Sequence, residues 1–145
     1  LNVKDDVLRD IIVDSSTSLL EFSKIISDQF GFDSKEISTF HISNENWEQL
    51  EEIKIFKIDD NDEIMDKAPI SNYFVLNGDK MIFVYDFLNY WTFFVELYEI
   101  DELSNSGSKF ECINSVGDVP KEAPSDIYNN TNEAYNFDQD ESLDL

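Results

Sequence analysis

The feature that most constrains the fold is a pair of alternating apolar segments between residues 81 and 98. Apolar side chains occupy every second position of each segment: Met81, Phe83, Tyr85 and Phe87, then Trp91, Phe93, Val95 and Leu97. Such alternation is typical of β-strands. Because only Leu88, Asn89 and Tyr90 separate the segments, we expect an antiparallel hairpin. Ile82, Val84 and Phe94 make the opposite face apolar too, so the hairpin should lie centrally in a sheet covered on both faces.

One helix is expected upstream, over residues 19–30. Ser18 and Glu21 have the spacing of a capping box, in which both side chains accept backbone N–H groups of the first turn. Gly31 supplies the left-handed residue that ends a helix. Apolar residues recur between them at three- and four-residue steps: Leu19, Phe22, Ile26 and Phe30. An isolated helix of about 12 residues is marginal in water, so this stripe should pack on the sheet, while loops, the C-terminal tail or a partner cover the other face.

Shorter patterns predict three more strands, over residues 8–13, 37–43 and 52–58. Mutual repulsion among acidic side chains predicts an exposed loop over residues 59–63. The combination gives an α+β fold in which an antiparallel or mixed sheet carries one main helix on a face. We expect one domain over residues 1–124 and a disordered acidic tail over residues 125–145, which hold six acidic and no basic residues.

The charge excludes several classes of function. Thirty-two acidic residues against 10 basic ones leave a net charge of −22. Duplex affinity depends on basic side chains that displace counterions, so direct nucleic-acid binding is disfavoured. No apolar run approaches the ~20 residues of a membrane span, no signal peptide is visible, and a single Cys cannot form an internal disulfide. These features predict a cytoplasmic protein.

No familiar catalytic, metal or cofactor motif is present. The acidic run at residues 59–63 lacks the glycine and the bidentate Glu of a calcium loop. His41 and Cys112 are the only His and Cys, too few for a zinc site, and the four glycines form no phosphate-binding loop. We therefore expect no cofactor and no metal, and we favour a non-catalytic protein over an enzyme.

Two residue sets in the hairpin leave alternatives open. Asp86 follows an apolar strand, where a carboxylate needs partners. It either accepts backbone N–H groups in the following turn or has a functional role, and we favour the turn. The aromatic side chains either form core or stack nucleobases. Core is favoured, because Lys80 is the only basic residue between positions 79 and 100.

The order of features resembles the plasmid pRiA4b ORF-3-like family over about residues 1–124, and an acidic branch from Bacteroidetes-type bacteria in particular. The family pattern has a Trp-Arg-Arg strand, a Leu-rich helix ending near Phe-Gly-Trp, a Tyr-Asp-Phe-Gly-Asp-x-Trp hairpin and a Cys-containing Pro-Pro-Glu-Asp segment. The residues that match it closely are Arg9, Gly31, the Tyr85-Asp86-Phe87 triplet and Trp91. The departures include Leu8 in place of Trp, Asp10 in place of the second Arg, Leu88-Asn89-Tyr90 in place of Gly-Asp-x, and Val119-Pro120-Lys121-Glu122 in place of the last motif.

The resemblance implies a β-grasp-like start with added strands, in which another strand within residues 1–7 pairs with residues 8–13. It implies no reaction. Family members have been labelled resolvase-like, but a serine resolvase needs several Arg residues for phosphate, and Arg9 is the only Arg in this chain. That label is rejected here.

Three functions remain open. The first is a non-catalytic interaction module with an unidentified protein partner, favoured because aromatics are abundant while catalytic sets are missing. The second is an acidic decoy that mimics nucleic acid toward a DNA-handling protein of a mobile element. The third is a small-ligand or enzyme domain at the end of the hairpin. The candidate binding residues are Arg9, Tyr85, Asp86 and Trp91.

Overall fold

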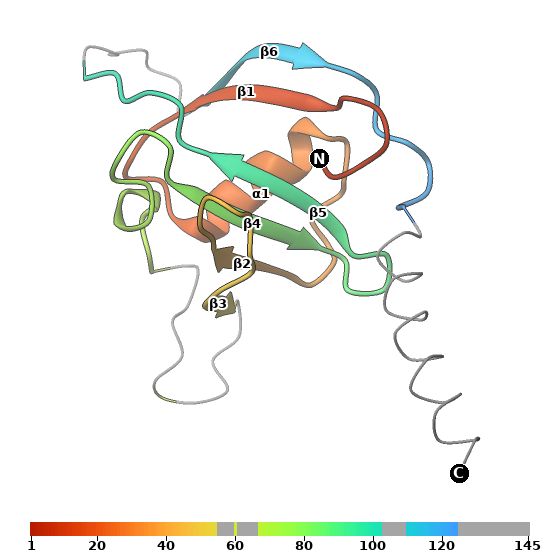
Figure 1. The fold of residues 1–145 in the computed structure, drawn as a ribbon, viewed down its shortest axis with the longest axis horizontal. Coiled ribbons are helices and arrows are strands. Elements are labelled where there is room, and N and C mark those ends of the chain that lie inside the picture. The colour runs from red at the N-terminus through yellow and green to blue at the C-terminus, as the bar shows by residue number, and fades with distance from the viewer. Residues whose placement is uncertain (55–59, 61–66, 103–109, 125–145) are drawn as a thin grey trace.

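The computed structural model describes residues 1–54, 60, 67–102 and 110–124. These residues form an α+β fold with one α-helix, one 3-10 turn and six strands in two antiparallel sheets (Figure 1). The elements are β1 (Leu8–Val13), α1 (Leu19–Gln29), β2 (Ser38–Ile42), β3 (Glu52–Lys54), η1 (Ile70–Asn72), β4 (Lys80–Tyr85), β5 (Trp91–Glu96) and β6 (Phe110–Val116).

The predicted aromatic hairpin is confirmed. Strands β4 and β5 pair antiparallel, with Phe83 opposite Phe93 and Tyr85 opposite Trp91. The first strand ends at Tyr85, two residues before the predicted end. The reason is Asp86, whose φ of 63° takes the backbone out of the extended region. Phe87, which was predicted to be the last apolar residue of this strand, instead lies half-exposed in the turn.

The hairpin forms part of a four-stranded sheet in the order β3-β2-β4-β5. One face packs against α1, which lies behind the sheet in Figure 1. The core between these layers consists mainly of aromatic and branched side chains: Leu19, Phe22 and Ile26 from the helix, and Phe40, Ile53, Met81, Phe83, Tyr85, Trp91 and Phe93 from the strands. The predicted placement of helix on sheet is therefore correct.

Both predicted ends of the helix are also correct to within a residue. The Ser18 hydroxyl accepts a hydrogen bond from the Glu21 backbone N–H at 3.1 Å, and Gly31 has a φ of 80°. Two serines on the buried face were not foreseen. Their hydroxyls donate back to helix carbonyls, Ser23 to Leu20 at 2.6 Å and Ser27 to Ser23 at 2.8 Å, so neither polar group is buried without a partner.

The loop between β2 and β3 covers the other face of the sheet. Trp47 in this loop has a φ of 57° and stacks on Phe94 of β5, with ring centroids 4.9 Å apart. The ammonium group of Lys80 lies 5.4 Å from the centre of the Trp47 ring. In Figure 1 the loop passes in front of β4. Of the predicted coverings for this face, a loop is the one observed.

Strands β1 and β6 form a separate two-stranded antiparallel sheet, here called the ribbon. The expectation that β1 pairs with residues 1–7 is wrong, and the β-grasp-like hairpin ahead of the helix does not form. Residues 1–7 contain no strand and run instead to the edge of β5, where the Asn2 N–H donates to the Thr92 carbonyl at 2.8 Å. The partner of β1 comes from the far end of the described chain.

The remaining predictions are tested in part. Strand β2 lies within the predicted 37–43, and β3 confirms the start of the predicted 52–58, whose later part lies outside the described residues. The loop at 59–63, apart from exposed Asp60, and the acidic tail at 125–145 also lie outside them. No helix among the described residues is long and apolar enough to cross a membrane.

Candidate functional site

Arg9 joins the ribbon to the helix. Its side chain lies on the inner face of β1, over the ring of Phe30 at 4.9 Å. The guanidinium donates from Nε to the Gln29 carbonyl at the end of α1 (3.2 Å), and from Nη1 to the carbonyls of Leu8 (2.8 Å) and Val116 (2.9 Å). A cation at a helix C-terminus opposes the negative end of the helix dipole. Arg9 therefore has a structural task in this fold.

Tyr85 is buried at the end of β4 and bonded to a surface carboxylate. Its hydroxyl donates to Asp33 Oδ1 at 2.7 Å, and that oxygen also accepts from the Lys35 N–H at 3.0 Å. The Tyr85 bond is the main cause that lowers the pKa of Asp33 below its usual value. Burial, and then the Asp33 bond, raise the pKa of Tyr85. The pair is thus a neutral donor on a charged acceptor, with no group poised to exchange a proton near neutral pH.

Trp91 completes a row of aromatic rings beneath the end of the helix. The ring of Phe32 lies 5.0 Å from Trp91 and 5.1 Å from Tyr85, and Phe30 lies 4.8 Å from Phe93. The structure therefore brings Trp91 and Tyr85 into one cluster, which reaches Arg9 through Phe30 and Phe93. Both ring side chains are buried, so they support the core and offer no stacking surface.

Asp86 is held by its own turn, as the favoured of the two alternatives predicts. Its Oδ1 accepts the Leu88 N–H at 3.1 Å and its Oδ2 accepts the Asn89 side-chain amide at 2.6 Å. Its own N–H donates to the Ile37 carbonyl at 3.0 Å. Both carboxylate oxygens therefore have partners within the chain, and this lowers the case for a catalytic or ligand-binding hairpin end.

The described residues contain no group of three or more His, Cys, Asp or Glu that could hold a metal ion. Burial lowers the pKa of His41, while the Glu52 carboxylate opposite it on β3 acts in the other direction. A hollow of about 80 Å³ lies between the N-terminal segment and residues 118–120. Ligand pockets usually enclose several hundred Å³, so this hollow has the scale of a few water molecules.

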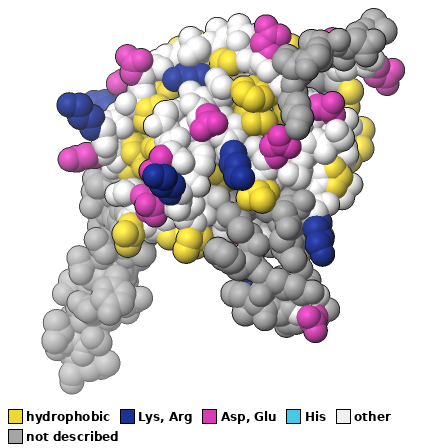
Figure 2. Space-filling model, turned by 180° about the vertical axis from the view of Figure 1, so that it is seen from behind, with side chains coloured by type: hydrophobic (Ala, Val, Ile, Leu, Met, Phe, Trp, Pro, Cys, Tyr) yellow, Lys and Arg dark blue, Asp and Glu magenta, His cyan; other side chains and the backbone are white. Residues whose placement is uncertain are grey.

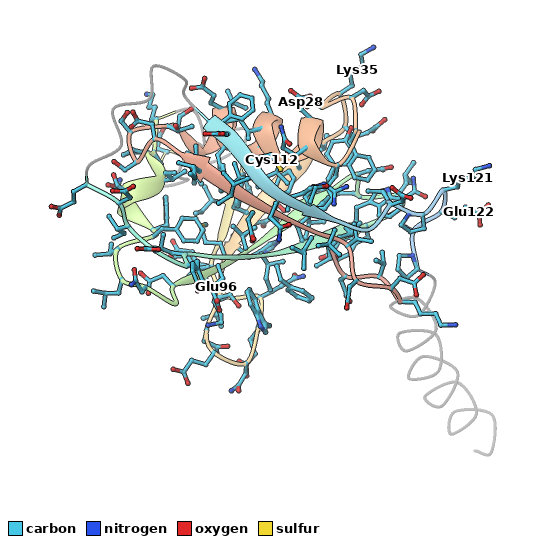
Figure 3. The ribbon with its side chains drawn as sticks, turned by 90° about the horizontal axis from the view of Figure 1, so that it is seen from above. Asp28, Lys35, Glu96, Cys112, Lys121 and Glu122 are labelled. Carbon is cyan, nitrogen blue, oxygen red and sulfur yellow. The ribbon has the colours of Figure 1, made fainter. Side chains whose placement is uncertain are left out.

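The surface feature that the sequence analysis missed is the ribbon. Five large apolar side chains on its two strands are 39–59% exposed: Leu8, Ile12, Phe110, Ile113 and Val116. Leu8 lies opposite Val116, and Ile12 lies opposite Glu111, so these side chains share the outer face. Figure 3 views the ribbon from above, with Cys112 labelled on β6. The signal available beforehand was weak, because Phe-Glu-Cys-Ile-Asn-Ser-Val alternates poorly.

The same face carries acidic groups. Asp10 lies opposite Asn114 and accepts a hydrogen bond from its side-chain amide at 3.1 Å. Glu111 is exposed and lies opposite Ile12, the next outward-facing residue of β1. Residues 1–13 and 110–124 together hold six acidic and three basic residues, and the guanidinium of one of these three, Arg9, is committed to backbone carbonyls. The outer face therefore combines exposed apolar side chains with the acidic groups Asp10 and Glu111.

Acidic groups of the described residues form no continuous row on the face that Figure 2 shows. Figure 2 shows the face behind that of Figure 1, where acidic side chains are dispersed among apolar patches and Lys or Arg side chains. A nucleic-acid mimic needs carboxylates that follow a regular phosphate spacing. The dispersed pattern on this face offers no such row.

Comparison with known proteins places the chain in a family. No curated protein matches it. The crystal structure of MM3350, a protein of unknown function from Methanosarcina mazei Go1, matches with a TM-score of 0.71 and 22% identity, covering 92% of this chain and 75% of that chain. At this identity the likeness shows the fold alone. The family model described as plasmid pRiA4b ORF-3-like protein matches residues 1–144, so the chain belongs to the plasmid pRiA4b ORF-3-like family.

Proposed function

We propose that this protein is a non-catalytic interaction module of the cytoplasm whose ribbon contacts a protein partner. The observation that carries the proposal is the concentration of half-exposed apolar side chains on β1 and β6. Single exposed apolar residues need no explanation, but several gathered on one face together with charged groups are characteristic of interaction surfaces. On the outer face of the ribbon, Leu8 and Val116 form an apolar pair at one end and Ile12 lies at the other, with Asp10 between them and Glu111 opposite Ile12.

The other candidate sites support this choice by their internal bonding. Asp86 is satisfied by its turn, Arg9 by backbone carbonyls, and Tyr85 by Asp33. A catalytic group must also face a cavity in which it can reach a substrate, whereas these three side chains are bonded within the fold. The hairpin-end ligand hypothesis therefore ranks below the interaction module.

Charge indicates the kind of partner. A protein of net charge −22 repels other acidic molecules and attracts basic ones from a distance. The partner surface should combine apolar side chains, which bury the outer face of the ribbon, with Lys or Arg residues near Asp10 and Glu111. Because exposed ion pairs are screened by salt, retention of this partner should weaken as ionic strength rises.

Affinity capture with matched variants tests the proposal. The full chain is immobilised and exposed to lysate of its source organism as wild type, as Leu8→Ser with Val116→Ser, and as Val75→Ser with Leu76→Ser. The last pair is exposed too, at 57% and 68%, but it lies between η1 and β4, outside the ribbon. We expect one or more proteins to be retained by the wild type and the control and lost by the ribbon variant. Equal retention by all three forms would contradict the proposal, as would retention by none.

The acidic decoy remains a weaker proposal for a member of an acidic, mobile-element-associated branch. It draws on the net charge and on the mobile-element associations that the family resemblance implies. High charge serves solubility in many proteins, and the dispersed acids of Figure 2 favour that explanation. An immobilised decoy would retain a basic DNA-binding protein, and competing duplex DNA would release that protein. The Leu8 and Val116 substitutions would not affect this retention.

A further inference from the structure

We propose that the free edge of β6 accepts an added β-strand from the partner, and that this strand is an extended basic segment. The inference rests on the proposed function, because it assigns the mode of binding to the same ribbon. Within residues 1–54, 60, 67–102 and 110–124, β6 pairs with β1 alone. Its other edge presents a row of backbone N–H and C=O groups, which is the template that strand addition uses.

The edge strands of the two sheets differ in the features that discourage pairing. Natural edge strands are protected by short length, by charged residues, above all Lys, and by Pro. The described part of β3 carries two charged residues, Glu52 and Lys54. Strand β6 is seven residues long, has no Lys or Pro, and carries Glu111 as its one charged residue. By this comparison β3 is a closed edge and β6 an open one.

The other edge of the four-stranded sheet is occupied in part. The outer edge of β5 receives the N-terminal segment, where the Asn2 N–H donates to the Thr92 carbonyl. The other edge of the ribbon is β1, which is six residues long and carries the charged residues Arg9 and Asp10. Among the described edges, β6 is therefore the longest one without such protection.

The side chains beside this edge specify the added strand. A strand paired with β6 would place alternate side chains on the outer face of the ribbon, next to Glu111, Asn114 and Val116. Directly opposed residues lie about 5 Å apart, close enough for a Lys or Arg to meet Glu111 and for an apolar residue to cover Val116. A strand that alternates basic and apolar residues fits both requirements.

Charge argues against the two occupants closest at hand. A second copy of the chain would bring another net charge of −22 to the edge. Residues 125–145 hold six acidic residues and no basic one, so they too would be repelled by Glu111 and its acidic neighbours. A basic segment of another protein is the occupant that the electrostatics favour.

A defined peptide tests the proposal on the full chain. The probe is a seven-residue peptide of alternating Lys and Val, blocked at both ends, titrated at low salt while backbone amide NMR signals are followed. Two control peptides keep the length: one is N-methylated at every residue and so lacks N–H donors, and the other has Glu in place of Lys. We expect saturable shifts centred on Phe110–Val116 with the probe and with neither control.

Matched protein variants test the electrostatic part. Glu111→Gln should weaken probe binding roughly two- to fivefold, the range expected for one cross-strand charge pair. Glu45→Gln is the control, since Glu45 is also exposed but lies in the loop between β2 and β3. It should leave the affinity unchanged within error. Sedimentation velocity of the unliganded chain should show a monomer.

Each alternative result overturns a named part of the inference. Equal binding by the N-methylated peptide would mean that side chains alone attract the probe, without strand addition. Shifts centred on Glu52–Lys54, absence of binding, or a dimer that Glu111→Lys strengthens would each reject β6 as an edge for a basic strand. Capture of a partner through Leu8 and Val116 without peptide binding would leave the proposed function standing and reject strand addition. Peptide binding without any captured partner would support an open β6 edge and contradict the proposed function.

Discussion

The two sheets use similar apolar residues for different purposes. In β4, every residue after Lys80 is buried, and Phe83 is fully enclosed between Phe40 and Phe93. In β6, Cys112 is the one residue that is not exposed, although Phe110, Ile113 and Val116 are as hydrophobic as their counterparts in β4. The difference lies in what surrounds each strand, so the apolar content of a strand does not by itself show whether it belongs to the core.

Coverage explains the contrast. The four-stranded sheet has α1 on one face and the Trp47 loop over part of the other, so its central strand β4 is buried on both faces. The ribbon has cover on its inner face, where Val13 packs on the core and Arg9 reaches the end of α1. Its outer face remains in solvent. We therefore expect the sheet to supply most of the stability, whereas the ribbon has an apolar outer face in solvent.

The strongest test of this contrast is a pair of truncations. Phe83→Ala should lower the free energy of unfolding by about 3–5 kcal/mol, because it leaves a cavity between Phe40 and Phe93. Ile113→Ala, at a side chain that is 59% exposed, should cost less than about 1 kcal/mol. Urea unfolding measures both. Similar losses would contradict the division into core sheet and surface ribbon.

Glycine substitutions sharpen the comparison at the end of the ribbon. Gly117 has a φ of 76°, and a Cβ there would lie 2.1 Å from the backbone oxygen of Asp6. Gly78 has a φ of 95° with open space around it. Gly78→Ala should cost about 1–2 kcal/mol for the left-handed backbone alone, and Gly117→Ala roughly 2–4 kcal/mol because the chain must also shift. Equal thermal stability of the two variants would mean that the N-terminal segment does not pack on Gly117.

Arg9→Lys probes the joint between ribbon and helix. Lys keeps the charge but cannot bond the Gln29 and Val116 carbonyls together, so we expect a loss of about 1 kcal/mol in unfolding free energy. Lys24→Gln, on the exposed side of α1, is the control and should stay within about 0.5 kcal/mol of the wild type. An Arg9→Lys variant as stable as the wild type would show that the ribbon is attached to the helix without these two hydrogen bonds.

The smallest effect concerns the pH dependence at the hairpin end. The lowered pKa of Asp33 stabilises the fold above about pH 4, and this contribution is lost as the pH falls through the pKa of the folded state. Tyr85→Phe removes the main cause, so the Asp33 pKa should rise toward its ordinary value and the acid-side loss should shrink. NMR titration of carboxyl carbons measures it. Asp79, whose pKa is lowered by the Leu76 and Val75 N–H groups, is the internal control.

An unchanged Asp33 pKa in the Tyr85→Phe protein would show that the bond between the two side chains is not formed in solution. The raised pKa of Tyr85 gives the opposite dependence in the wild type. Its contribution to stability is complete below about pH 10 and is lost as the pH rises through the pKa of the folded state. Tyr85→Phe should remove this alkaline loss.

The parts of the fold with local signals were predictable. Ser18, Gly31 and the stripe between them define α1 because capping and periodicity act within a few residues. The hairpin followed from its strict alternation and short link. The end of β4 was not predictable to the residue, because a left-handed Asp86 depends on hydrogen bonds to Leu88 and Asn89 that alternation does not encode.

The ribbon could not be read from local patterns. Strand β6 has weak alternation and a bulge at Ile113, and its partner β1 lies about a hundred residues earlier in the chain. Pairing at that separation depends on the whole fold. The structure places Arg9, Tyr85 and Trp91 in one aromatic region and Asp86 in its turn, and the burial of Tyr85 and Trp91 shifts the proposed binding surface from the hairpin end to β1 and β6.

The most direct test of the account is residue-resolved hydrogen exchange of the full, unliganded chain. Amides throughout β4 should exchange only through global unfolding. In β6, amides that point toward β1 should be protected, whereas alternate amides on the outer edge should exchange nearly as fast as those of exposed loops. Slow exchange at every position of Phe110–Val116 would mean that the edge is already covered and would contradict the central claim that the ribbon is open for a partner.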